Sequence, residues 1–363
     1  MKWLLFVPML FICSVTYAAP TVSSLSGNTL TGASFGNAPD IVFFDDFENG
    51  TLNDDISLSG AVYGEYNGLS STYQPYYTNS IAVSGNLAMQ SDLSLATGVA
   101  AYVTLNATEI FIDWHLQLPA DTNPPYGSEL SINWKQMWLL GESTVDDDLV
   151  IPTVLGSTPP YIVLDDVDYY VNGNESDPGY TKSLDLDAPL TYGDWAHWSC
   201  HIKGGYNNDG VFKFWEVYSG GVHVSANDTG VNTLKSGGLW KEVGINAYGR
   251  QTDDCNPSFD DVYIAVGANC QARLVVGDNA TYLSSTKTAI QVADEDNWSA
   301  TEIDVYAWNQ GAFTDNETAY LFVIDTDGSV SNGLQGHFLN GTFYTGSTYT
   351  KLSNITASNI TFS

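Results

Sequence analysis

Two short segments of the chain concentrate residue types that could bind a sugar or act on it. Residues 194–203, DWAHWSCHIK, hold two tryptophans, two histidines and a lysine, and residues 211–217, VFKFWEV, add another lysine and another tryptophan. Aromatic faces stack on sugar rings, while His, Asn, Gln and Lys side chains can hydrogen-bond to sugar hydroxyls. The two segments are therefore candidates for a carbohydrate-binding surface.

Alternation along a β-strand divides the first segment into two faces. Trp198, Cys200 and Ile202 form an apolar face, which predicts a core. The opposite face carries Trp195 and the two histidines. That face is typical either of an open, concave sheet that meets a sugar or of a surface packed beneath a loop or a neighbouring domain.

Other predicted strands add residues of the same kind. In residues 211–217, Phe212 and Phe214 have the buried parity, and residues 110–118 and 243–250 also alternate. If these strands are neighbours in one sheet, their polar residues line a single groove. With the isolated Lys135, the carbohydrate-binding candidates are His115, Gln117, Lys135, Trp195, His197, His201, Lys213, Trp215, Asn246 and Tyr248.

Two chemistries fit such a groove, and a third function needs no groove. The first, and the main interpretation, is a carbohydrate-binding or surface-attachment protein without catalysis. The alternative is a lyase that removes the proton α to a uronate carboxyl, with His197 or His201, Tyr248 and Arg250 as base, acid and carboxylate-neutralising group. The third is a self-associating structural or filament protein, which the strand content alone favours.

Strand patterns dominate the rest of the sequence and predict an all-β protein. Short runs of Val, Ile, Tyr, Phe, Trp and Thr alternate with polar residues between Gly, Asn and Asp turns, with no sustained helical stripe. The composition changes along the chain predict four parts. They are a signal peptide (1–18), a lead-in segment (19–39), a large β-domain (40–271) and a small β-sandwich module (272–363).

Charge restricts the possible partners. The chain of 363 residues has 11 Lys and Arg against 42 Asp and Glu, a net charge of −31. Nucleic-acid binding needs clustered basic residues, so this class of partner is excluded, and polyanionic glycans would need calcium or a local basic patch. With the expected signal peptide and no segment long enough for membrane insertion, we expect a secreted or cell-surface protein whose partner is a polysaccharide or a cell-surface glycan.

Several motifs resemble those of the concanavalin A-like lectin/glucanase superfamily, especially of bacterial jelly-roll polysaccharide lyases. They are FFDDFENGT, WKQMWL, WAHWSCHIKGG, DGVFKFWEVYSGG and FDDVYIAVG, and together they cover roughly residues 41–270. The resemblance implies a jelly-roll β-sandwich for this part of the chain. The E-x-D-x-x-E pattern of retaining hydrolases of this fold is absent, and Glu216 stands alone, so hydrolysis by the two-carboxylate route is not expected.

Two further features concern stability. The resemblance implies a structural calcium ion with Asp45, Asp46 and Asp261 as ligands, although these acids also fit solvated turns. In an exported protein, Cys255 and Cys270 could close a short loop as a disulfide.

Overall fold

The chain folds almost entirely into antiparallel β-sheets. The computed structural model describes residues 18–69, 74–92, 100–118, 133–141, 148–154, 161–166, 182–183, 186–187, 190–205, 208–234, 238–248 and 256–345. Within these ranges the strands form three sheets, and one short 3-10 turn, η1 (Tyr282–Ser284), is the described helical element. The expected all-β class is confirmed.

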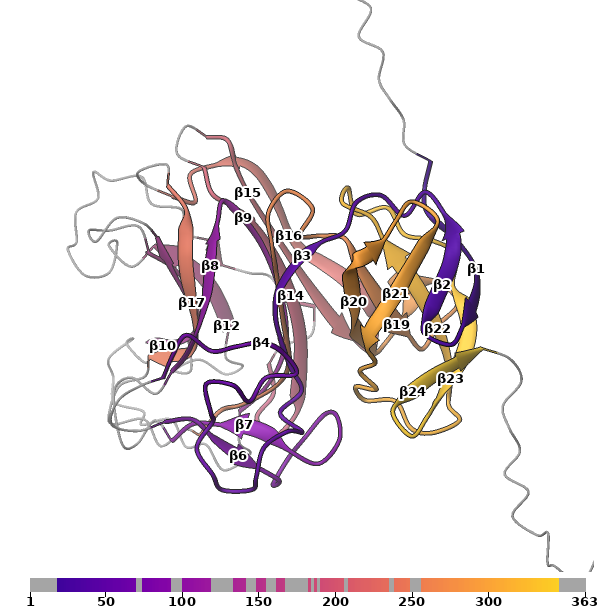
Figure 1. Cartoon of the computed structure of the whole chain (residues 1–363). Helices are drawn as coiled ribbons and strands as arrows, with labels where there is room; N and C mark the ends of the chain where they lie inside the picture. Colours follow the sequence, from indigo (N-terminus) through magenta and orange to yellow (C-terminus); the bar gives the residue numbers. More distant parts are fainter. Residues whose placement is uncertain are drawn as a thin grey trace, which may run out of the picture.

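The middle layer, called here the central sheet, has nine strands (Figure 1). Its main path runs in the order β16 (Gly221–Val231), β15 (Gly210–Tyr218), β14 (Trp195–Lys203), β9 (Glu109–Gln117), β18 (Ser258–Val266), β3 (Asp40–Asp45) and β4 (Tyr63–Gly64). The short strands β6 (Tyr76–Thr78) and β7 (Ala88–Gln90) pair with each other and join the sheet at β18.

A seven-stranded sheet, called here the outer sheet, packs on one face of the central sheet. Its order is β13 (Lys182–Ser183), β12 (Tyr161–Asp166), β11 (Asp148–Val154), β10 (Asn133–Gly141), β17 (Trp240–Tyr248), β8 (Ala101–Ala107) and β5 (Gly68–Leu69). A buried aromatic cluster fills the space between the two layers, with the Trp114 ring centroid 6.1 Å from those of Trp198 and Phe214. Burial of these large rings supplies much of the apolar driving force for the sandwich.

The third layer, called here the terminal sheet, has eight strands. Its order is β1 (Thr21–Ser26), β2 (Thr29–Ala33), β21 (Glu302–Ala307), β20 (Thr288–Trp298), β19 (Arg273–Gly277), β22 (Thr318–Ile324), β23 (Leu334–Leu339) and β24 (Thr342–Thr345). The first strand, β1, lies against β23 and β24, so the two edges of this layer approach each other. The fold is thus a jelly-roll sandwich with a second, smaller β-module.

The segment expected to be a lead-in belongs to the terminal sheet. Strand β2 pairs with β21, with Leu30 opposite Ile303. The side chain of Asn332 accepts a hydrogen bond from the backbone N–H of Val22 and donates one to its carbonyl oxygen, both at 2.9 Å. The few apolar residues of the segment, Val22, Leu30 and Phe35, are buried, so this small and polar sequence still contributes to a core.

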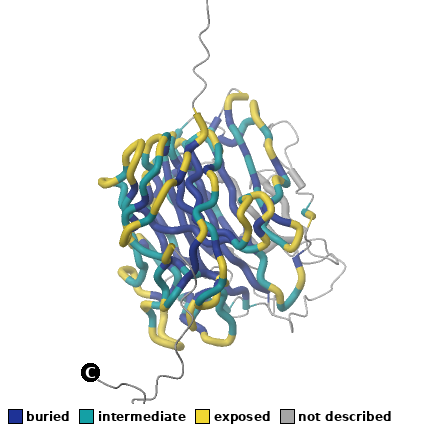
Figure 2. Tube along the Cα trace, turned by 90° about the vertical axis from the view of Figure 1, so that its right-hand side faces the viewer, coloured by how far each residue is buried: buried dark blue, intermediate teal, exposed yellow. Residues whose placement is uncertain are grey.

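The central sheet is covered on both of its faces. The terminal sheet packs on the face opposite the outer sheet, and Phe44, Phe111 and Tyr263 of the central sheet share a core with Val275 and Ile290 of the terminal sheet. Figure 1 shows the three layers in this order, and Figure 2 shows buried residues running through the middle of the molecule. Every residue of β18 is buried, as expected for a strand between two packed layers.

The expected disulfide is not supported. Cys270 is buried with a free thiol, and Cys255 lies outside the described residues. Burial in the apolar contact with the terminal sheet suits Cys270 as a small hydrophobic residue. Cys200 is likewise buried and free. Within the described part of the chain, no helix is long and apolar enough to cross a membrane.

Leu30→Ala tests whether the N-terminal strands belong to the folded core. Because the Leu30 side chain is fully buried, the variant should lower the free energy of unfolding by about 2–5 kcal/mol, measured by urea titration. Leu58→Ala, at a half-exposed position, is the control and should change it by less than about 0.5 kcal/mol. Equal, small effects of the two variants would show that residues 21–33 do not contribute to the core.

Candidate functional site

The structure divides the predicted groove between two sheets. Most of its members lie on β9, β14 and β15 of the central sheet, namely His115, Gln117, Trp195, His197, His201, Lys213 and Trp215. Lys135 lies on β10, and Asn246 and Tyr248 lie on β17, in the outer sheet. Arg250 lies outside the described residues. The candidates therefore do not line one groove, because their strands belong to opposite layers of the sandwich.

The terminal sheet covers the polar face of β14. The residues His115, His197 and His201 are each at most 6% exposed. The hydroxyl oxygen of Thr288, on β20, lies 3.4 Å from Nδ1 of His197. The sequence allowed this face to be either an open sheet or a surface packed beneath a neighbouring domain. For these three histidines, the structure shows packing. Alternation identified the two faces of the strand, but it carried no information about what covers them.

A buried polar network occupies part of this covered face. The rings of His115 and His197 stack with their centroids 3.9 Å apart, and Nε2 of His197 lies 2.9 Å from Oδ1 of Asp113. The Ser199 hydroxyl donates to the other oxygen of Asp113 at 2.5 Å. Burial, followed by the neighbouring His197, holds the pKa of His115 well below its usual value. The network satisfies Asp113, Ser199 and Nε2 of His197, whereas Nδ1 of His115 is buried without a hydrogen-bond partner among the described residues. Buried polar groups usually need such partners.

His201 is a buried, neutral residue. Neither ring nitrogen has a hydrogen-bond partner within the described structure. Burial, followed by the charges of Lys213 and Arg273, lowers the pKa of His201 to about 3. At neutral pH the imidazole is therefore uncharged and out of reach of a sugar, so His201 does not fit the role of base or ligand.

The acids expected to bind calcium accept hydrogen bonds from other groups of the protein. Asp45 is fully buried, and its two carboxylate oxygens accept hydrogen bonds from the backbone N–H of Phe47 and the hydroxyl of Tyr66, each at 2.8 Å. One oxygen of Asp261 accepts a hydrogen bond from Ser84 at 2.9 Å. Asp46 is half-buried. A calcium ion held by these three acids stays a prediction.

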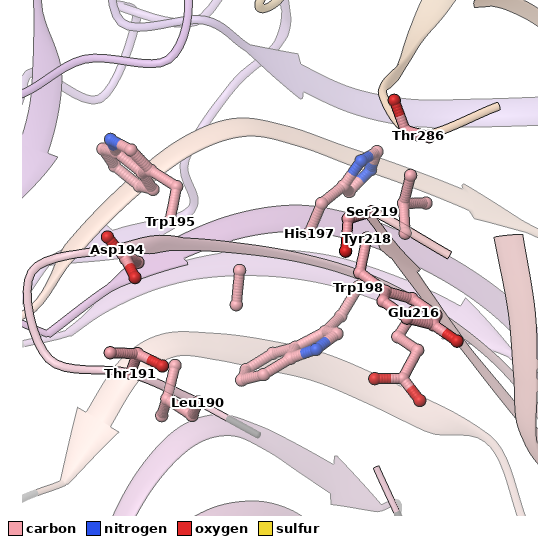
Figure 3. Close-up of a pocket in the computed structure, with 12 residues that line it drawn as sticks. Leu190, Thr191, Asp194, Trp195, His197, Trp198, Glu216, Tyr218, Ser219 and Thr286 are labelled. Atoms are coloured by element: carbon pink, nitrogen blue, oxygen red, sulfur yellow. The ribbon is translucent and has the colours of Figure 1, made fainter. Parts of the chain in front are cut away.

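A cavity opens at the end of β14 and β15, with a volume of about 390 Å³. Figure 3 shows Asp194 and Trp195 at one end of it and Glu216 and Tyr218 at the other. Trp198 also lines the cavity, so aromatic and carboxylate side chains face the same space. Trp195 and His197 were expected site residues. Asp194, Glu216 and Tyr218 were not predicted as site residues. They line the cavity because the start of β14 and the end of β15 lie side by side.

A break in the alternation of β10 determines the position of Lys135. Gln136 and Met137 are consecutive and both fully buried, and the Trp114 indole N–H donates to Oε1 of Gln136 at 3.2 Å. The register of β10 shifts at this point, so that Lys135 is the direct partner of Tyr248 on β17. A bulge of this kind changes which face the following residue occupies. Strict alternation along β10 therefore could not predict which residue of β17 lies opposite Lys135.

Aromatic residues flank this part of the outer sheet. Gly244 of β17 is the register partner of Tyr102 on β8 and of Trp138 on β10. Tyr102 and Trp138 are half-buried, whereas their neighbours along the strands are buried in the core. Half-buried aromatic side chains offer a face on which a sugar ring can stack.

The comparisons with known proteins give similarities of fold. No family model and no curated protein matches the sequence. Among solved structures, an endo-β-1,4-glucuronan lyase from the fungus Trichoderma reesei is 13% identical, with 60% of this chain and 96% of that chain covered and a TM-score of 0.41. A mutant of alginate lyase Aly36B in complex with an alginate tetrasaccharide is 12% identical, with 63% and 98% covered and a TM-score of 0.44.

A third similar structure is the marine PL-14 alginate lyase from Aplysia kurodai. It is 11% identical, with 60% of this chain and 98% of that chain covered and a TM-score of 0.38. All three similar structures are named as lyases, and each is matched at a TM-score below 0.5.

His201→Phe tests the structural role of this histidine. Because the ring nitrogens of His201 are buried without partners, the variant should raise the free energy of unfolding by about 1 kcal/mol or more in urea titrations. His197→Phe is the contrasting variant, since it removes the imidazole that bonds to the buried carboxylate of Asp113, and it should lower stability by about 1–3 kcal/mol. A loss of stability in His201→Phe would contradict this assignment.

Asp45→Asn should alter how stability depends on pH. Burial raises the pKa of Asp45 from its usual value to about 8. Between the unfolded pKa near 4 and pH 8 the folded protein keeps a proton that the unfolded chain releases, so this group reduces stability as pH rises through that window. The variant should therefore gain stability relative to the wild type between pH 5 and about 9, as measured by urea midpoints. If the difference in free energy of unfolding between Asp45→Asn and the wild type did not change with pH, the raised pKa of Asp45 would be refuted.

Proposed function

We propose that the protein is an extracellular polysaccharide lyase that cleaves a uronate-containing glycan by β-elimination on the outer sheet. The observation that carries the proposal is the register of β10 and β17, which places Lys135 directly opposite Tyr248. Tyr, with its phenol, is a suitable proton donor and acceptor, and Lys is a suitable partner for a carboxylate. These are two of the functions that β-elimination requires.

The reaction assigns each group a defined task. The base removes the proton on the carbon α to the uronate carboxyl, a double bond forms to the adjacent ring carbon, and the bond from that carbon to the glycosidic oxygen breaks. The leaving oxygen takes up a proton. In this proposal Tyr248 exchanges the protons, while Lys135 neutralises the carboxylate and so makes the α-proton more acidic.

The histidines of the central sheet lie in a different layer from Tyr248. His201 is buried, and His197, although it is 6% exposed, lines the cavity at the end of β14. Of the residues expected for a lyase, the outer sheet retains Tyr248, and Arg250 follows it in the sequence two residues later. Asn246, also on β17, is a further candidate for binding the carboxylate.

Charge on the outer sheet is mixed. Its strands carry Lys135, Lys182 and Lys241 together with four acids, Asp148, Asp165, Asp166 and Glu242. Exposed charges farther apart than about 10 Å are largely screened at physiological salt. The charge that matters for a uronate at Tyr248 is therefore that of its register partner, Lys135. Tyr102 and Trp138 supply aromatic surface on the same sheet, opposite Gly244.

Glycan binding without catalysis is the second candidate function, and the cavity beside β14 and β15 favours it. Trp195 and Tyr218 offer aromatic surface there, while Asp194 and Glu216 can accept hydrogen bonds from hydroxyl groups. This chemistry suits a neutral sugar, because two carboxylates would repel a uronate.

An activity assay with matched variants tests the lyase proposal. The purified protein is incubated with alginate, polyglucuronate and neutral glycans while the ultraviolet absorbance of unsaturated uronate products is followed. The wild type should release product from a polyuronate, and Tyr248→Phe should lower kcat by at least about 10²-fold because the exchangeable phenol proton is lost.

Lys203→Ala is the control, since this lysine lies on the central sheet with its side chain 45% exposed, and it should leave kcat unchanged. Absence of product from every polyuronate would overturn the lyase proposal. Retention on a neutral glycan without product would then support binding at the cavity.

A further inference from the structure

We infer that Asp187, Glu216 and His223 form a binding site for a divalent transition-metal ion. Glu216 lies on β15, His223 lies opposite it on β16, and Asp187 comes from the described segment 186–187. Among the described residues, this is the one group of three such side chains whose ligand atoms all lie within 4.8 Å of one another. The site lies on the central sheet and is separate from the proposed lyase residues of the outer sheet.

The distances match those between the ligands of one ion. Nδ1 of His223 lies 3.3 Å from Oδ2 of Asp187 and 3.3 Å from Oε1 of Glu216. Two ligand atoms that are each about 2.1 Å from a tetrahedral zinc ion lie roughly 3.4 Å apart. Charge-assisted hydrogen bonds are usually shorter, about 2.7–2.9 Å. The imidazole is therefore placed better for sharing an ion with the two carboxylates than for hydrogen bonding to them.

The surrounding hydrogen bonds orient the two carboxylates. The Ser225 hydroxyl donates to Oε1 of Glu216 at 2.6 Å, and the backbone N–H of Asp187 donates to the same oxygen at 2.7 Å. The Tyr218 hydroxyl donates to Oδ2 of Asp187 at 3.0 Å. Carboxylates that bind metal ions are typically held by such bonds. The register of β15 and β16 shifts beside Ser225, and this irregularity brings the serine to Glu216.

Burial separates His223 from the other histidines. All five histidines lie in the described part of the chain, and the other four are less than a tenth exposed. The side chain of His223 is 41% exposed, while that of Glu216 is 1% exposed. An ion arriving from solvent can thus reach one imidazole, and it would compensate the charge of an almost fully buried carboxylate.

The donor atoms indicate the class of ion. One imidazole nitrogen with two carboxylate oxygens suits Zn²⁺ or Mn²⁺, whereas Ca²⁺ prefers oxygen donors alone and more of them. Glu216 also lines the 390 Å³ cavity, so a ligand in that cavity would lie beside the ion (Figure 3).

Calorimetric titration of the full chain with Zn²⁺ tests this inference. The buffer contains physiological salt and excess Ca²⁺, which occupies nonspecific sites on the acidic surface. The wild type should bind one Zn²⁺, and His223→Gln and Asp187→Asn should each weaken binding at least about tenfold. Circular dichroism of each variant confirms folding, so that the loss of a ligand is distinguished from the loss of structure.

Glu65→Gln is the matched control, because it removes one exposed carboxylate elsewhere on the surface and should leave Zn²⁺ affinity unchanged. His201→Phe is a second control that removes a buried histidine. Absence of saturable Zn²⁺ binding by the wild type, or equal affinity in the wild type and His223→Gln, would overturn the inference.

Discussion

The burial of both faces of the central sheet is the constraint on which the rest of the structure depends. One face packs against the outer sheet through the cluster around Trp114 and Trp198, and the other packs against the terminal sheet through residues such as Phe111 and Tyr263. Polar groups on such a sheet lose their water and must find partners within the protein. The bonds of Asp113 with His197 and Ser199 meet this requirement for these three side chains, whereas both ring nitrogens of His201 lack a partner in the described part of the chain.

The same constraint limits where function can lie. With the middle layer covered, the accessible surfaces are the outer sheet, the terminal sheet, where Tyr306 and Tyr344 are exposed, and the open ends of the sandwich. On the outer sheet, the register of β10 and β17 brings Lys135 and Tyr248 together beside Tyr102 and Trp138. At one end of the central sheet, the termination of β14 and β15 leaves the cavity next to Glu216 and His223. Both sites arise where regular pairing is interrupted, by a register shift or by the end of a strand, and such interruptions change the direction of side chains.

The terminal sheet also joins the two ends of the chain. Strands β1 and β2 precede the jelly roll in sequence but complete the sheet that follows it, and Asn332 binds the backbone of Val22 across 310 positions. The jelly-roll strands between them are therefore enclosed by a module that requires both ends of the described chain. Contacts so distant in sequence are costly to form during folding, which links the integrity of the terminal sheet to that of the whole molecule.

The sequence by itself determined the all-β class and the core face of β14 and β15, since Trp198, Cys200, Phe212 and Phe214 are in the core as alternation predicts. These are local properties, because each residue's face follows from its neighbours along the strand. Only the tertiary structure decided that the opposite face of β14 is covered, that Lys135 meets Tyr248 and that Glu216, a lone acid in the sequence, lies beside His223. Strand order, register shifts and the packing of layers depend on contacts between distant segments, which the pattern within a single strand does not encode.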